Sequence, residues 1–499
     1  MISQNLKTVA DSINMSIFLK ALLLNPPFEG KTIERRGRCT RLDPHGWVHP
    51  PLHLMYYSSV LKRDGIEAKV LDAIAEKKSA DDVIEFCRAF SPDFIVSWTG
   101  NFSYAVDIKI LEKIKQHFPK IVTFLAGTDL VIAKPELFLS KPFIDFTISS
   151  EAEVALQDIP KFISGKIKKE KVRNICYLQK GKVKKNKHEL IEDLDDIPFP
   201  DRDAVDNSLY KGFPFFSESF TDLLTSRGCP FNCTICTSKL YWGSSYRERS
   251  AENILAEIEE CVNKYKIKTF FILDDTFNLN KKKVLKLCGM IVKKGIKIKW
   301  GCQTRVDLVD DEMLKAMAKA GCVYIHYGAE SGSQRLLDYF NKGITPKQTI
   351  KAFELTRKYG IENCATFIVG TPVDKPGDLE MTLELYRKIK PDYVHVSPLI
   401  PIVGSLIYRQ MKREGILKHE DYSKYVKPNI NFNPKYMTED EIKKEYREAW
   451  RKMSLDKDYM FRNFVRAFAK RDARFFLESF RAGFWILKTF FIQPKGEED

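Results

Sequence analysis

The most informative segment of the chain reads Thr225-Ser226-Arg227-Gly228-Cys229-Pro230-Phe231-Asn232-Cys233-Thr234-Ile235-Cys236. Its cysteines have the spacing C-x3-C-x2-C and follow the apolar pair Leu223-Leu224, which indicates the end of a strand. A short loop with this spacing can direct three thiolates at one small centre, and soft thiolates suit zinc or an iron–sulfur cluster. Three ligands leave one position of a four-ligand centre open for a substrate or cofactor.

The alternative is that these cysteines are small buried side chains or part of a structural zinc site. Zinc would need a fourth ligand, and the sequence contains no partner motif of the form C-x2-C or H-x3-5-H elsewhere. The nearest downstream cysteine, Cys261, lies in a helical pattern. The sequence therefore favours a cluster.

The loop resembles the cluster loop of radical S-adenosylmethionine (SAM) enzymes. The resemblance implies that Cys229, Cys233 and Cys236 bind a [4Fe–4S] cluster, whose fourth iron binds SAM through its amino and carboxylate groups. An external electron donor would supply the electron that cleaves SAM to methionine and a 5′-deoxyadenosyl radical. Ile235 stands where the family commonly has an aromatic residue, and because it is still apolar we count it among the SAM-binding residues.

Length and composition agree with a soluble, multidomain protein. A chain of 499 residues is long enough for two or three domains. It contains no apolar run of about 18 residues that could span a membrane, and its first residues lack the apolar core of a secretion signal. Eleven cysteines without a regular pairing pattern indicate a reducing cytoplasm.

The formal net charge of +15 comes largely from scattered lysines, which are typical of a solvated surface. We find no signature of an RNA-binding module, so the sequence does not favour nucleic acid as a partner.

Residues 1–165 alternate apolar strands with amphipathic helices. The expected strands are 18–25, 67–72, 93–97, 120–126 and 144–148. This pattern predicts a doubly wound, flavodoxin-like parallel sheet, in which ligands bind beyond the carboxyl ends of the strands.

The order of these elements resembles the cobalamin-binding domain that precedes the cluster domain in one large class of radical SAM enzymes. An Asn-Pro-Pro after the first strand and a proline-led helix at residue 50 match that class. The class often has a second glycine beside Gly127 and a Gly-Glu-Gly-Glu turn, and this chain has Ala126 and a Ser-Glu-Ala-Glu turn at 150–153. The resemblance implies cobalamin contacts from the strand ends, namely Asn25, Pro26, Ser97, Thr99, Gly127, Thr128 and Glu151. The alternative is a structural sheet, or a sheet that holds another cofactor.

Residues 166–218 combine lysine runs, an acidic run and several prolines. This composition predicts a linker with a short hairpin.

Residues 219–420 again alternate strands and helices. With the strand before Cys229, further strands are expected at 269–273, 297–303, 324–328, 365–369 and 393–397. The expected helices are 251–264, 281–293, 312–320, 347–359 and 379–388. Six such units match the partial (β/α) barrel of the radical SAM family, in which chemistry takes place at the carboxyl ends of the strands.

The strand ends supply the remaining candidates for SAM binding. Asp274 and Asp275 could meet the amino group, and Arg305 could pair with the carboxylate. Glu330, in a segment that resembles the family's G-x-E-S-G, suits the amino group or the ribose, and Gly370 suits the adenine. Each acid could instead cap a helix or form a surface pair, and Asp275 could cap the helix that follows it.

No catalytic residue is assigned from the sequence. His326 and His395 lie in expected strands, where a histidine is more often hydrogen-bonded in the core than active.

Residues 421–499 are expected to be helical. Between 461 and 491, phenylalanines are interleaved with arginines and lysines. Such a helix can lie in a membrane interface, or it can pack its aromatic face on the mouth of the barrel. Either arrangement hints at an apolar or lipid substrate, and the membrane alternative would place this cytoplasmic protein in peripheral contact with a membrane.

These observations predict a cobalamin-dependent radical SAM enzyme that acts on an unactivated carbon of a small molecule, by methyl transfer. One alternative is radical cyclisation, ring contraction or carbon–carbon coupling without methyl transfer. An alternative of another class is a non-catalytic, membrane-associated protein that binds a metal or an Fe–S cluster.

Overall fold

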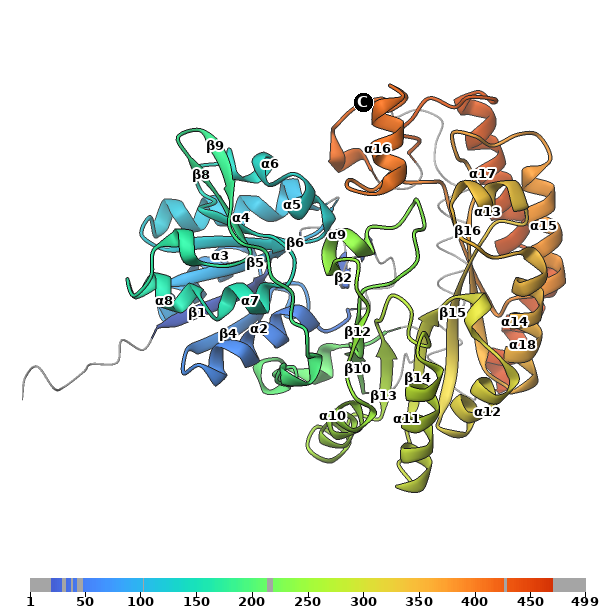
Figure 1. Cartoon of the computed structure of the whole chain (residues 1–499), viewed down its shortest axis with the longest axis horizontal. Coiled ribbons are helices and arrows are strands. Elements are labelled where there is room, and N and C mark those ends of the chain that lie inside the picture. Colours follow the sequence, from blue (N-terminus) through green and yellow to red (C-terminus); the bar gives the residue numbers. More distant parts are fainter. Residues whose placement is uncertain are drawn as a thin grey trace, which may run out of the picture.

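The structure is a computed structural model that describes residues 19–28, 33–36, 39–42, 48–101, 103–212, 219–425 and 429–469. Two α/β units lie side by side, the first in blue to blue-green and the second in green to orange (Figure 1). The short helix α9 (Ser238–Trp242) lies between them (Figure 1).

The first unit is built on a sheet with the strand order β4-β1-β5-β6-β7-β8-β9. The strands that pair in parallel are β1 (Lys20–Asn25), β4 (Glu67–Asp72), β5 (Phe94–Thr99), β6 (Val122–Gly127) and β7 (Phe146–Ile148). Their order is that of the flavodoxin-like fold, so the predicted doubly wound sheet is confirmed. β5 is buried at every position, as expected of a central parallel strand that is covered on both faces.

Helices cover both faces of this sheet. One face packs on α2 (Leu52–Arg63) and α7 (Ala152–Leu156), and the other packs on α3 (Ala80–Phe90) and α4 (Tyr104–His117). Shorter helices are α5 (Asp129–Ala133), α6 (Pro135–Leu139) and α8 (Ile159–Ile163).

The hairpin expected within residues 166–218 is formed by β8 (Ile175–Gln179) and β9 (Lys182–Lys185). It extends the first sheet, because β8 pairs antiparallel with β7. Part of the expected linker is therefore an edge of this sheet. A second hairpin joins β2 (Ile33–Arg36) to β3 (Cys39–Leu42).

The second unit is a six-stranded parallel sheet in sequential order, which is the predicted partial barrel. Its strands are β10 (Phe220–Leu223), β13 (Thr269–Ile272), β14 (Lys299–Thr304), β15 (Cys322–Glu330), β16 (Glu362–Ile368) and β17 (Tyr393–Ser397). Its helices are α10 (Ala251–Asn263), α11 (Lys281–Lys293), α12 (Asp311–Lys319), α13 (Gln334–Tyr339), α14 (Pro346–Lys358) and α15 (Asp378–Ile389).

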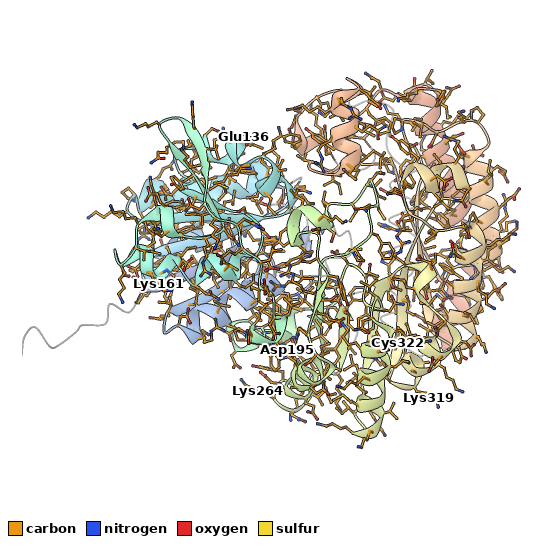
Figure 2. The ribbon with its side chains drawn as sticks, viewed as in Figure 1. Glu136, Lys161, Asp195, Lys264, Lys319 and Cys322 are labelled. Atoms are coloured by element: carbon orange, nitrogen blue, oxygen red, sulfur yellow. The ribbon has the colours of Figure 1, made fainter. Side chains whose placement is uncertain are left out.

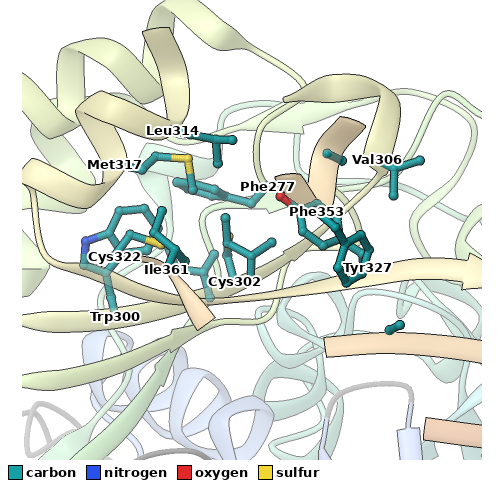
Figure 3. Close-up of a cluster of buried hydrophobic side chains, with 14 of the residues drawn as sticks. Phe277, Trp300, Cys302, Val306, Leu314, Met317, Cys322, Tyr327, Phe353 and Ile361 are labelled. Atoms are coloured by element: carbon teal, nitrogen blue, oxygen red, sulfur yellow. The ribbon is translucent and has the colours of Figure 1, made fainter. Parts of the chain in front are cut away.

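The main core of the barrel lies between the strands and these helices. Figure 3 shows Trp300, Cys302 and Tyr327 from the strands meeting Met317 and Phe353 from the helices. Alternate strand residues therefore point outward to the helices, and the residues between them face the lumen.

Side chains fill the junction between the two units (Figure 2). Asp195, labelled there, accepts a hydrogen bond from the backbone N–H of Ser250 at the start of α10, at 2.9 Å. Glu257 of α10 pairs with Arg202 and Arg249, and all three side chains are buried. The junction is thus tied by ion pairs that span the expected linker and the barrel.

The C-terminal region is helical, as predicted, with α16 (Leu406–Arg413), α17 (Glu439–Ser454) and α18 (Lys457–Ala469). Tyr446 and Met453 of α17 pack into the barrel core, so this helix covers the outside of β17. Most of the aromatic and basic stretch, which was expected either to lie in a membrane interface or to pack on the mouth of the barrel, lies after residue 469, outside the described residues. Among the described residues, no helix is long and apolar enough to cross a membrane.

Candidate functional site

The cysteine loop begins with a backbone geometry that requires glycine. Gly228 has φ +88°, and a Cβ at this position would lie 2.2 Å from the carbonyl oxygen of Ser245. Just before it, β11 (Ser226–Arg227) pairs with β12 (Arg247–Glu248), which holds the base of the loop. The loop therefore leaves the end of β10 in a defined direction.

Asp274 supports this loop from the end of β13. Its buried carboxylate accepts hydrogen bonds from the backbone N–H of Thr225 (2.6 Å), the hydroxyl of Thr225 (2.5 Å) and the hydroxyl of Ser226 (2.6 Å). Burial raises the pKa of Asp274, and these hydrogen bonds oppose that rise. The contacts make Asp274 a positioning residue for the loop, and its predicted contact with SAM stays a prediction.

The sulfur atoms of the three cysteines each have a neighbouring hydrogen-bonding group. Thr276 Oγ1 lies 3.5 Å from the Sγ of Cys229, Arg305 donates to Cys233 at 3.7 Å, and the backbone N–H of Ser238 donates to Cys236 at 3.4 Å. Such contacts are typical of the thiolates that hold iron–sulfur clusters. Cys229 and Cys233 are half-buried and Cys236 is exposed, so the loop faces open space.

In the described part of the chain, no three potential ligands converge closely enough to hold a single metal ion. An iron–sulfur cube spaces its ligands more widely than one ion does, and the donors around the sulfurs fit that group.

Arg305 lies beside the cluster loop rather than open to solvent. Its guanidinium binds both oxygens of Asp307, at 2.9 and 3.0 Å, and it stacks 3.7 Å from the ring centroid of Phe231. It also donates to the backbone carbonyl of Lys342 at 2.6 Å. The predicted pairing of Arg305 with the SAM carboxylate would have to share this guanidinium with Asp307.

Glu330 forms an ion pair that the sequence did not predict. Lys342 Nζ lies 2.6 Å from Glu330 Oε1, and both side chains are largely buried. Burial lowers the pKa of Lys342, but the Glu330 carboxylate and the nearby Cys233 together outweigh this, and the net shift is upward. Glu330 itself has φ +58° after a register shift at Gly328, a backbone strain found at functional positions. No motif marks Lys342, which the turn after α13 brings to Glu330.

Two predicted SAM residues meet at one apolar cluster. Ile235 packs against the cluster that contains Ile442 of α17, and a Cβ at Gly370 would lie 2.7 Å from a methyl carbon of Ile442. Asp275, another predicted SAM residue, accepts a hydrogen bond from the hydroxyl of Ser238, which lies two residues after Cys236. Ile235 and Asp275 therefore lie in or beside the cysteine loop, and their predicted contacts with SAM, like that of Gly370, stay predictions.

The predicted cobalamin residues lie at the carboxyl edge of the first sheet. Asn25 donates to Asp72 at 2.7 Å, with Pro26 directly after it, and Thr99 donates to Asp107 at 2.7 Å. Thr128 donates to the side-chain oxygen of Asn101 at 2.5 Å. These contacts shape the loops that follow three neighbouring strands.

Two features of this edge fit a bound cofactor. A Cβ at Gly127 would lie 2.6 Å from the carbonyl oxygen of Thr99, so only glycine allows the two strand ends to approach. The buried hydroxyl of Ser97 has no hydrogen-bond partner among the described residues, nor has the indole N–H of Trp98. Unpartnered polar atoms at a strand end suit a polar ligand.

Glu151 lies at the junction between the units. Its carboxylate accepts from the backbone N–H of Ile191 at 2.7 Å and pairs with Arg247 at 2.8 Å and Arg227 at 3.3 Å. Glu153 binds Arg227 at 2.5 Å. The pKa of Glu151 is lowered because the two arginines and its hydrogen bonds outweigh burial. Glu151, a predicted cobalamin residue, thus binds Arg227, which lies two residues before Cys229. This ion pair anchors the cysteine loop to the first sheet.

An aromatic cluster lies beside this anchor. His53 of α2 stacks on Trp98 at 4.7 Å, and Tyr241 and Trp242 of α9 complete the contact. Burial and the nearby Arg227 lower the pKa of His53 to about 3, so its ring is neutral.

The chain is similar to known proteins along most of its length. Residues 223–386 match the Radical SAM superfamily. The uncharacterized methyltransferase PH0819 of Pyrococcus horikoshii is 31% identical over 436 residues, covering 87% of this chain and 92% of that protein. The anaerobic magnesium-protoporphyrin IX monomethyl ester cyclase of Cereibacter sphaeroides is 27% identical, covering 87% of this chain and 74% of the cyclase. The chain belongs to the radical SAM superfamily, whose enzymes use a [4Fe–4S] cluster and SAM.

Solved structures show the same two-unit fold. The cobalamin-dependent SAM radical enzyme OxsB, with aqua-cobalamin and SAM bound, has a TM-score of 0.72 at 18% identity, covering 93% of this chain and 70% of OxsB. The methyltransferase TsrM of Kitasatospora setae, with cobalamin and a [4Fe–4S] cluster bound, has a TM-score of 0.66 at 16% identity. The match covers 86% of this chain and 81% of TsrM. The chain therefore has the fold of cobalamin-dependent radical SAM enzymes.

Proposed function

We propose that this enzyme binds cobalamin and transfers a methyl group to an unactivated carbon of a small molecule. The observation that carries the proposal is the direct anchoring of the cysteine loop on the first sheet, through Arg227 and the carboxylates of Glu151 and Glu153. This contact makes the cluster loop and the carboxyl edge of the first sheet neighbours, so a substrate at the junction could reach both cofactors.

In this proposal residues 1–165 bind cobalamin, 166–218 connect the two units, 219–420 hold the cluster and SAM, and 421–499 form the helical C-terminal region. Cys229, Cys233 and Cys236 would hold the cluster, and Gly127, Thr128 and Ser97 would contact cobalamin. When bound, the cluster and SAM supply a 5′-deoxyadenosyl radical and cobalamin carries the methyl group. The protein's own residues orient these groups: Asp274 sets the loop, and Glu330, Arg305, Ile235 and Gly370 surround the SAM position.

The relatives support two reactions. PH0819 is named a methyltransferase, and so is the cytidylyl-2-hydroxyethylphosphonate methyltransferase of Streptomyces wedmorensis, which is 25% identical. The magnesium-protoporphyrin ester cyclases favour the second candidate, radical cyclisation or carbon–carbon coupling without methyl transfer.

The partners and location follow from the same features. An external electron donor and a small-molecule substrate suit a radical SAM enzyme. We infer a cytoplasmic location from the number of unpatterned cysteines. A lipid or other apolar substrate rests on the sequence pattern alone. α18 exposes Met460, Phe461 and Phe468, but Arg462 and Arg466 bind it to the backbone of residues 390–392 at the start of β17, away from the carboxyl ends of the strands. The same face would suit peripheral contact with a membrane.

The test begins with anaerobic reconstitution with iron, sulfide and cobalamin. With SAM and a reductant, the enzyme should form 5′-deoxyadenosine and transfer a labelled methyl group from SAM to product. Formation of deoxyadenosine together with an unmethylated product would favour the second candidate, a radical reaction without methyl transfer. If protein that carries the cluster forms neither deoxyadenosine nor a methylated product, the proposed enzymatic activity is contradicted.

Cys233→Ala is expected to lose cluster loading, measured by iron content and by absorbance. Cys288→Ala is the matched control, since Cys288 is buried in the barrel core on α11. Equal cluster content in the two variants would overturn the ligand assignment.

A further inference from the structure

The end of α13 and the turn after it lie against the cysteine loop. These residues, 339–343, are here called the 339–343 turn. The backbone N–H of Thr234 donates to the carbonyl of Phe340 at 2.8 Å, and the Thr234 hydroxyl donates to the carbonyl of Tyr339 at 3.1 Å. Thr234 directly follows Cys233. The turn therefore binds the loop on the C-terminal side of that cysteine.

The same turn binds the loop on the other side of Cys233. The Asn341 side chain donates to the backbone carbonyl of Asn232 at 2.9 Å. Asn341 has φ +49°, a left-handed conformation that asparagine adopts more readily than most residues do. Because the turn holds both neighbours of Cys233, it restricts where the Sγ of Cys233 can lie.

Arg305 joins the turn to Cys233. Its guanidinium donates to the backbone carbonyl of Lys342 at 2.6 Å and to both oxygens of Asp307, at 2.9 and 3.0 Å. It also stacks on Phe231, 3.7 Å from the ring centroid. These contacts fix the plane of the guanidinium, and its other terminal nitrogen donates to the Sγ of Cys233 at 3.7 Å. Arg305 is only 5% exposed, so water and salt have little access to screen its charge at this sulfur.

Two carboxylates balance the cations near Cys233. Glu330 lies 2.6 Å from Lys342 Nζ, and Asp307 binds Arg305. The N–H at the Cys233 sulfur comes from Arg305, so Asp307 is the carboxylate that most directly offsets the charge at this contact. Arg305 and Asp307 thus act on one sulfur with opposite signs.

The charge beside a cluster ligand affects the reduction potential of the cluster. Net charge, hydrogen bonds to the sulfurs and solvent exposure set that potential. Reduction adds negative charge, which a nearby cation stabilises and a nearby carboxylate destabilises. Both interactions are stronger in a buried site than in water.

We propose that the 339–343 turn and Arg305 position Cys233, and that the guanidinium of Arg305 raises the reduction potential of the cluster while Asp307 limits that rise. The inference rests on the proposed function, because Cys233 must be a cluster ligand. It gives Arg305 and Asp307 roles as positioning residues that do not depend on SAM.

The midpoint potential of the full-length enzyme, reconstituted anaerobically with iron and sulfide and free of SAM, tests the proposal. A redox titration followed by electron paramagnetic resonance of the reduced cluster measures it. Arg305→Gln should shift the potential to a more negative value by at least about 59 mV, which corresponds to tenfold weaker binding of the electron. Asp307→Asn should shift it to a more positive value, because this change removes the carboxylate and leaves Arg305. A residue that only packs the loop would not give shifts of opposite sign.

Arg387→Gln is the matched control. It makes the same change in charge at an exposed pair with Glu380 on α15, and it should leave the potential unchanged. Shifts of the same sign in Arg305→Gln and Asp307→Asn, no shift in either, or an equal shift in Arg387→Gln would overturn the proposal. If Arg305→Gln fails to load a cluster, Asp307→Asn decides, since only a positive shift supports the proposal. If both variants fail to load a cluster, the two residues serve loop folding alone and the role in the potential is overturned.

Asn341→Gly tests the 339–343 turn. Glycine keeps the left-handed backbone and removes the hydrogen bond to Asn232, so iron loss to a chelator should be about fivefold faster, as expected for the loss of one hydrogen bond. Lys180→Gly, at an exposed position with φ +50°, is the control. An unchanged rate in Asn341→Gly would overturn the positioning role of the turn.

The outcomes separate this inference from the proposed function. Retention of a normal cluster by Cys233→Ala would overturn the ligand assignment itself. An unchanged potential in Arg305→Gln and Asp307→Asn proteins that carry the cluster would overturn only the inference. None of these measurements needs SAM cleavage, so a failure of methyl transfer would leave both results interpretable.

Discussion

Arg227 and Glu153 form a buried ion pair at 2.5 Å across the junction of the two α/β units. Arg227 precedes the first cluster cysteine by two residues, and Glu153 belongs to α7 of the first unit. Arg227 also stacks over Trp242, 4.9 Å from the ring centroid. One side chain therefore links the cluster loop to the first sheet and to the helix between the units.

Replacement of Arg227 by Met should destabilise the protein and impair the cluster loop together. The change leaves Glu153 and Glu151 buried with fewer cations, and breaking a buried pair in this way typically costs about 3–5 kcal/mol. The thermal midpoint and the iron content should both fall. Arg88→Gln, which breaks the exposed Arg88–Glu85 pair on α3, should cost less than about 1 kcal/mol. Normal iron loading in a stable Arg227→Met protein would contradict the anchoring role.

Gly127→Ala should weaken cobalamin binding. The added methyl would meet the Thr99 carbonyl oxygen, and relieving that overlap typically costs about 1–3 kcal/mol. The corrinoid absorbance retained after desalting should fall at least about tenfold. Gly289→Ala offers the contrast, since no atom lies within 4 Å of the added methyl and α11 should gain about 0.5–1 kcal/mol. Full corrinoid retention by folded Gly127→Ala would argue against this edge as the cobalamin site.

Glu330→Gln should raise the KM for SAM while the cluster content stays normal. The amide keeps the shape of the side chain but removes the charge that Lys342 faces and that a SAM amino group would meet. Loss of one charged hydrogen bond predicts an increase of about tenfold or more. Deoxyadenosine formation as a function of SAM concentration measures it. Asp311→Asn, which breaks an exposed pair with Lys358, is the control. An unchanged KM would remove Glu330 from the SAM site.

Glu445 of α17 should make the protein less stable as the pH rises. Burial and the neighbouring Asp374 raise its pKa from 4.5 to about 7. Between these values the folded state binds more protons than the unfolded state, so stability falls as the pH rises through this window and levels off above about 7. Glu445→Gln removes the effect and should be more stable than the parent at pH 8, by about 1 kcal/mol after allowance for solvent screening.

The gain should shrink toward pH 5, and thermal melts across this pH range will show it. Glu384→Gln on α15, where Glu384 lies 3.9 Å from Lys388, should show no such trend. A gain at pH 5 as large as that at pH 8 would rule out titration of Glu445 as the cause.

Local patterns in the sequence predicted most of the fold. The expected helix at 281–293 coincides with α11, because Asn280 caps its start and apolar residues recur at the helical period. The expected strand at 67–72 coincides with β4. The hairpin of 166–218 was predicted, but its pairing with β7 was not, because an edge strand carries no local signal for its neighbour.

The sequence alone determined the cluster loop, the two alternating α/β units and the strand ends that could bind cofactors, because spacing and periodicity are properties of neighbouring residues. Only the tertiary structure decided that Glu151 anchors the loop and that Lys342 neutralises Glu330. Buried charges must find partners, and barrel strands must align in register, wherever along the chain those partners lie. Contacts of that kind depend on the folded arrangement and leave no trace in local sequence.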